Sequence, residues 1–182
     1  MAYHAGYLER SDASGEETDR GMRFVVENYL AILQESLEKK EQVLIRISKK
    51  NAAQRLILLE ESLDEEAFEE NVDGKTALIE ELLQLDSGFE QVYKRVEQEL
   101  SIHKDTYREE IRSLQELISR ITELSAQLRV QEERNKELAR QKFAETRAKI
   151  RTVKTGRQVA SRYYKTMSKV NYVDPQFMDS KK

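Results

Sequence analysis

Apolar residues recur at alternating steps of four and three along most of the chain, which is the pattern of helices that pack lengthwise on other helices. The clearest series comprises Tyr107, Ile111, Leu114, Ile118, Ile121, Ser125 and Leu128. It belongs to a stretch, residues 104–169, that contains no proline and one glycine. At 1.5 Å per residue, this stretch predicts a helix roughly 100 Å long.

Two similar runs precede it. The first predicted helix covers residues 22–50, starting after a cap at Thr18 or Asp19, and its apolar period resumes from Ala52 after the polar residues 48–51. The next runs from Lys75 to about residue 103. Between them, Asn-Val-Asp-Gly at 71–74 is the clearest turn signal. The first arm therefore is expected to turn at 71–74 and pair with the second.

The resulting prediction is an all-α, elongated antiparallel helical hairpin or coiled-coil-like bundle with a very long C-terminal helix. That helix either continues past the pair or folds back on it as a third helix. Polar residues 1–21 are expected to form a flexible leader, and residues 22–170 the helical domain. Residues 171–182 contain the only proline and are expected to form a flexible tail.

The composition agrees with long helices, since 36% of the residues are charged and the chain has no tryptophan. The absence of cysteine excludes disulfides and thiolate metal sites. No window approaches 18 consecutive apolar residues, so no transmembrane segment is expected.

Charge is distributed unevenly. Residues 1–100 carry 23 acidic and 12 basic side chains, whereas residues 134–170 carry 12 basic and 2 acidic ones. Attraction between the arms of a hairpin explains this polarity, and binding of nucleic acid or an anionic surface by the basic segment is the alternative.

Candidate sites for chemistry are weak. Residues 69–80 resemble a calcium loop, but Glu69 and Ala77 are poor matches to its first and ninth positions, so a glycine turn is favoured. The two histidines, His4 and His103, belong to no zinc motif. No phosphate-binding loop or nucleophile elbow is present, so we expect neither an enzyme nor a cofactor.

The C-terminal part of the chain has more apolar side chains than the predicted arms can cover. Packing within the molecule or a dimer, and docking of a foreign helix, are equally compatible with this surplus. The candidate partner-binding residues are Phe143, Ile150, Val153, Val159, Ala160, Tyr163, Tyr164, Met167 and Val170.

Several segments resemble the FlgN-type flagellar export chaperones, in particular a clostridial branch of that group. They are LSAQL at 124–128 with QEERNKEL at 131–138, VASRYYKTMSK at 159–169, YVDPQFMDSKK at 172–182 and KTALIEELLQLDSGF at 75–89. The resemblance spans about residues 22–182. It implies a cytoplasmic chaperone that holds hook–filament junction (hook-associated) subunits before type III secretion, and it assigns client contact to residues 143–170.

The terminal helix of the client subunit is the expected partner, and no nucleic acid is expected. Contact with the export apparatus and self-association stay open. Two alternatives remain: a structural homodimeric coiled-coil rod, and a basic-helix binder of nucleic acid or anionic surfaces.

Overall fold

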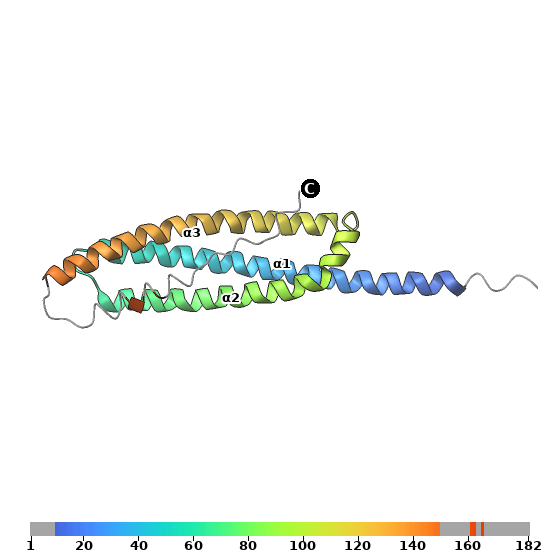
Figure 1. The fold of residues 1–182 in the computed structure, drawn as a ribbon, viewed down its shortest axis with the longest axis horizontal. Coiled ribbons are helices and arrows are strands. Elements are labelled where there is room, and N and C mark those ends of the chain that lie inside the picture. The colour runs from blue at the N-terminus through green and yellow to red at the C-terminus, as the bar shows by residue number, and fades with distance from the viewer. Residues whose placement is uncertain (1–9, 150–160, 163–164, 166–182) are drawn as a thin grey trace, which may run out of the picture.

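The computed structural model describes residues 10–149, 161, 162 and 165, and it consists of three long helices. They are α1 (Arg10–Leu59), α2 (Glu65–Ile102) and α3 (Arg108–Lys149), which run alongside one another in alternating directions (Figure 1). No strand occurs among the described residues. The predicted all-α, elongated antiparallel bundle is confirmed, and the third helix folds back onto the first two.

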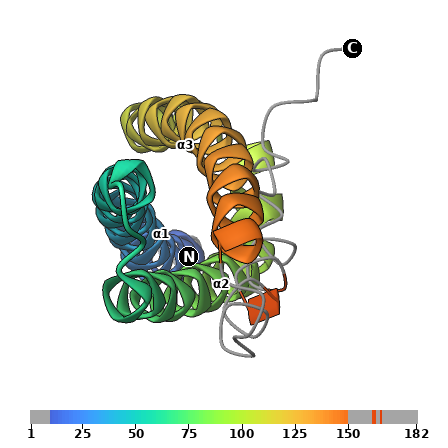
Figure 2. The ribbon, with the colours of Figure 1, turned by 90° about the vertical axis from the view of Figure 1, so that its left-hand side faces the viewer.

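α1 is the shared helix of the bundle. It packs against both α2 and α3, whereas no Cα atom of α2 lies within 8 Å of one in α3 along their described lengths. Seen end-on, α2 and α3 lie on different sides of α1 (Figure 2). Only longer side chains join these two helices, so the bundle has two close helix pairs and one wide side.

The first turn differs from the prediction. α1 ends at Leu59, and Asn71–Gly74 lies inside α2. Asp64 caps α2, because its Oδ1 accepts a hydrogen bond from the backbone N–H of Ala67 at 3.0 Å. The carboxylates of Glu65 and Glu66 in the first turn also stabilise the helix, because they lie near the positive end of its dipole. Asn71 is buried and donates to the carbonyl oxygen of Lys50 at 3.0 Å. This tertiary contact outweighs the local turn preference.

The second turn separates α2 from α3 and gives the second of the two expected arrangements, in which the C-terminal helix folds back on the pair. The backbone N–H of His103 donates to the carbonyl of Glu99 at 2.9 Å and closes α2. Tyr107 is buried beneath the turn and its carbonyl accepts from the N–H of Ile111 at 2.9 Å. The first residue of the predicted apolar series therefore anchors the reversal that brings α3 back along the bundle.

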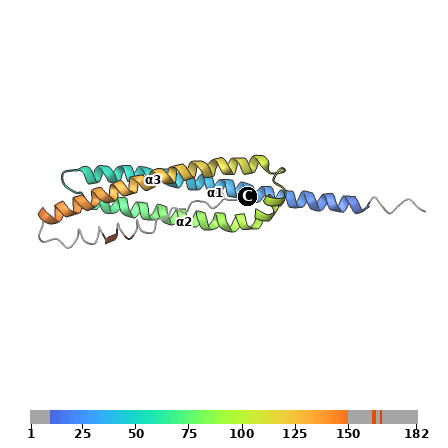
Figure 3. The ribbon, with the colours of Figure 1, turned by 45° about the horizontal axis from the view of Figure 1, so that its top comes forward.

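α1 begins at Arg10, before the expected cap, so residues 10–21 are helical where a leader was predicted. Its first turns project beyond the α2–α3 turn (Figures 1 and 3), and Met22, Phe24 and Val25 are exposed. α1 also continues through residues 48–51 without a break. Two of the polar side chains there face α3: Ser48 Oγ lies 3.3 Å and Asn51 Nδ2 lies 3.5 Å from Gln131 Oε1.

The buried apolar side chains form two clusters. The main core contains α1 residues from Val26 to Ile47, α2 residues from Leu78 to Leu100, and α3 residues up to Leu128 together with Tyr107. The end cluster, at the α1–α2 turn, consists of Leu58, Phe68, Val72, Ala139 and Phe143. A layer of buried polar side chains lies between them.

Candidate partner-binding surfaces

Phe143 is the one predicted partner-binding residue that the structure describes. Its exposed fraction is 4%, and its ring packs edge-on against that of Phe68, with 5.6 Å between centroids and an interplanar angle of 86°. The protein's own side chains cover it, so it contributes to the end cluster and offers no open surface. The other eight, Ile150, Val153, Val159, Ala160, Tyr163, Tyr164, Met167 and Val170, lie outside the described residues.

Some of the basic side chains after residue 134 are used inside the molecule. Lys142 donates to the carbonyls of Glu60 and Glu61, the latter at 3.0 Å, and so binds the free acceptors after α1. Arg162 pairs with Glu69 of α2 at 2.5 Å. Phe143 of α3 contacts Phe68, the neighbour of Glu69 in α2, so Arg162 and Phe143 lie at the same end of α2 although 19 residues separate them in the sequence. The contacts agree with attraction between the basic and acidic parts of the chain.

The polar layer centres on Lys75, whose side chain is completely buried. Its Nζ lies 2.6 Å from Glu132 Oε1 of α3 and 3.2 Å from Gln54 Oε1 of α1. Burial lowers the pKa of Lys75, because it disfavours the charged ammonium, and the nearby Glu132 carboxylate opposes this effect in part. Lys75 of α2 thus contacts both α1 and α3 at the same position along the bundle.

Asn135 completes the layer from α3. Its Nδ2 donates to the carbonyl of Asn51 at 2.8 Å and lies 3.2 Å from Gln54 Oε1. Among the residues that the structure describes, four buried side-chain atoms have no hydrogen-bond partner: Asn51 Oδ1, Gln54 Nε2, Asn71 Oδ1 and Glu132 Oε2. The described part of the chain holds no group of three or more residues suited to a metal ion. Since Lys75 is covered on all sides, the layer is suited to fixing the helices and not to contacting a substrate.

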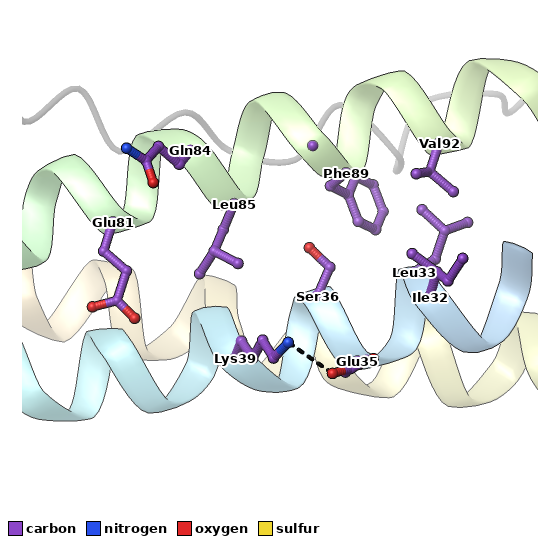
Figure 4. Close-up of a pocket in the computed structure, with 11 residues that line it drawn as sticks. Ile32, Leu33, Glu35, Ser36, Lys39, Glu81, Gln84, Leu85, Phe89 and Val92 are labelled. Atoms are coloured by element: carbon purple, nitrogen blue, oxygen red, sulfur yellow. Dashed lines mark ion pairs between the residues drawn. The ribbon is translucent and has the colours of Figure 1, made fainter.

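An open apolar groove follows the α1–α2 pair on its outer side (Figure 4). Its floor and walls are formed by Ile32 and Leu33 of α1 and by Leu85, Phe89 and Val92 of α2. They enclose a volume of about 330 Å³. Ile32 is 47% exposed. In the sequence, Leu85, Phe89 and Val92 recur at steps of four and three, which is the spacing of a packing face. This spacing gave no sign that Ile32 would leave that face partly uncovered.

A second section prolongs this groove towards the α1–α2 turn. It is lined by Arg46, Lys49, Lys50, Ala53, Gly74, Ala77, Leu78 and Glu81, and it shares Glu81 with the apolar section. We call the two sections together the seam groove. On α1 the two sections are lined by residues within 32–39 and 46–53, and the Arg46–Glu81 ion pair lies between α1 and α2 where the sections share Glu81. From Ile32 to Ala53 they span 21 residues of α1, a length of about 32 Å that matches a helix of about six turns.

No family model, curated protein or solved structure matches this chain. Within the described helices, no segment combines the length and apolar character needed to cross a bilayer.

Proposed function

We propose that this protein is a cytoplasmic flagellar export chaperone of the FlgN type, which binds the terminal helix of a hook–filament junction subunit before secretion. The observation that carries the proposal is the seam groove, an open helix-length surface with Ile32, Leu85, Phe89 and Val92 along it. The flagellar client comes from the sequence resemblance alone.

The physical basis of such a role is the burial of an apolar stripe. A subunit whose terminal helix pairs only after assembly exposes that stripe beforehand, and an exposed apolar stripe promotes aggregation. A groove between two helices can cover it by helix-in-groove packing. The groove is open and rimmed by charged side chains such as Glu35, Lys39 and Glu81, which favours a contact that can be released.

The alternatives have less support in the structure. Lys142 and Arg162 are engaged by the acidic end of the bundle, which weakens the case for a nucleic-acid binder. A homodimeric rod would use the same apolar surface between two copies, and it predicts a thermal melt that depends on concentration.

The test is complex formation between the purified chain and a hook–filament junction subunit, followed by size-exclusion chromatography with light scattering and by calorimetry. We expect a stoichiometric complex with the intact subunit and none with a subunit that lacks its terminal helix. Absence of a complex with the intact subunit, or equal binding of the truncated one, would count against the proposal.

The resemblance also assigns client contact to the C-terminal segment, which remains a prediction for residues 150–170. Replacing Tyr163, Tyr164 and Met167 together by alanine should weaken the complex while the helical circular-dichroism signal stays constant. An unchanged affinity would remove these residues from the binding surface without affecting the seam groove.

A further inference from the structure

We infer that the seam groove binds an amphipathic helix of a particular chemistry: apolar along the half that meets Phe89, and acidic along the half that meets Lys49. This inference rests on the proposed function, because it specifies the kind of client helix that the groove accepts. It follows from the different side chains that line the two sections of the groove.

The apolar section has room for side chains of a partner. A Cβ atom placed on Gly88 would have no other atom within 4 Å, so the α2 wall is open at this point. Phe89 stacks on Tyr93 with 6.3 Å between the ring centroids and an interplanar angle of 8°, which holds its ring along the wall. Leu33 is completely buried and closes the floor. Apolar side chains entering here would lose contact with water on the sides that face Leu33 and Phe89.

The other section is basic. Three cationic side chains, Arg46, Lys49 and Lys50, line it together with one carboxylate, that of Glu81, which pairs with Arg46 at 3.1 Å. The lining charges therefore leave an excess of two positive charges. This local excess contrasts with the first hundred residues as a whole, where acidic side chains outnumber basic ones by 23 to 12.

Small residues bring the backbone of a partner close to these cations. Ala53, Gly74 and Ala77 line the same section, so these three positions present no large side chain of their own to a helix. Lys50 lies over Gly74, since its Nζ would be 2.9 Å from a Cβ there, and its flexible end can turn towards an incoming carboxylate. Charge complementarity of this kind sets the orientation of a partner and speeds association.

The experiment uses two fluorescent synthetic peptides of 21 residues with the same apolar stripe. One carries glutamates, and the other lysines, on the half expected to meet Lys49. Anisotropy titration against the full chain at low ionic strength should show about tenfold tighter binding of the glutamate peptide, a difference of about 1.4 kcal/mol. The preference should shrink as salt is added.

Two variants of the protein test the location. Gly88→Leu fills the open wall and should weaken both peptides about tenfold. The double variant Arg46→Glu, Lys49→Glu should reverse the preference between the peptides. Arg112→Glu is the matched control, because Arg112 is an exposed cation on α3 outside the groove, and it should change neither result.

Equal binding of the two peptides, or an affinity for the glutamate peptide that Gly88→Leu leaves unchanged, would overturn the inference. So would a dimer that Gly88→Leu dissociates in the absence of peptide binding, because a second copy would then occupy the groove. If the junction subunit still binds in these cases, only the inference fails. If the glutamate peptide binds but the subunit does not, the flagellar function fails instead.

Discussion

The two sides of the polar layer are built differently. The main core continues through most of the bundle and is apolar, with Leu33, Leu44 and Ile121 completely or almost completely buried. The end cluster comprises, among the described residues, three buried side chains around the Phe68–Phe143 pair, and it is closed by polar contacts such as that of Lys142 with the turn. The apolar side chains of the main core supply most of the free energy of unfolding, because the hydrophobic contribution grows with the apolar area removed from water.

The polar layer supplies what the apolar core cannot. Leucines and isoleucines at heptad spacing pack almost as well when one helix slides by one repeat, whereas Lys75 has its counter-ion only in the observed register. A slip would leave a buried ammonium without its carboxylate, which is costly. The layer therefore opposes slippage of α3 along the other two helices. It also lies between the end cluster and the main core, so it is the place at which the end cluster can open independently of the main core.

The largest expected effect comes from breaking the layer. Glu132→Ala leaves the buried ammonium of Lys75 without its ion-pair partner, and the loss of one partner of a buried pair typically costs about 3–5 kcal/mol. Urea denaturation should show a loss of this size. Glu133→Ala, at an exposed neighbouring position, should change the free energy of unfolding by less than about 0.5 kcal/mol.

A double variant distinguishes the pair from its surroundings. Lys75→Met with Glu132→Leu removes both charges, and apolar replacement of a buried ion pair is often neutral or stabilising. We expect it to regain most of the stability lost in Glu132→Ala. A double variant as unstable as the single one would show that the layer acts by shape and not by charge.

The second effect compares the two clusters directly. Leu44→Ala should lower the global free energy of unfolding by about 2–5 kcal/mol. Phe143→Ala removes a side chain of similar burial, but it should act first on the end cluster. Hydrogen exchange should then accelerate in residues 54–75 and 132–147 while α1 near Leu44 stays protected. Uniform acceleration along α1 would show that the two clusters open together.

The smallest effect concerns glycines within α2. Gly88→Ala should raise the free energy of unfolding by about 0.5–1 kcal/mol, because alanine is the better helix former and the added methyl group meets no other atom. Gly74→Ala should gain less, since the Lys50 side chain must move aside. Thermal melts would measure both, and a larger gain at Gly74 would contradict the position of Lys50.

The sequence was sufficient for the helices and insufficient for the turns. Apolar periodicity predicted the helical class and the packing face of the series from Tyr107 to Leu128, in which Leu114, Ile118 and Ile121 are buried. It misplaced the first turn because Asn71 and Gly74 carry a local turn signal that tertiary contacts with Lys50 override. The Asp64 cap could not be recognised in the sequence, because Asp64 is one of several neighbouring acidic residues.

The polar layer and the seam groove could not be predicted from the sequence for a related reason. Gln54 and Asn135 interact across 81 positions of the sequence, and their pairing depends on the register of α1 against α3. The groove depends on the distance between α1 and α2 at the level of Ile32 and Phe89. Neither the register nor the spacing of helices follows from the periodicity of one helix.

The role of α1 as the shared helix has a consequence during biosynthesis. α1 is complete at Leu59, but its second partner is complete only at Lys149, and a ribosome adding roughly 5–20 residues per second needs about 5–18 s for the intervening 90 residues. During that interval α2 can cover one flank of α1, while the flank destined for α3 stays bare. The newborn chain is therefore open to wrong association through this flank until α3 is complete.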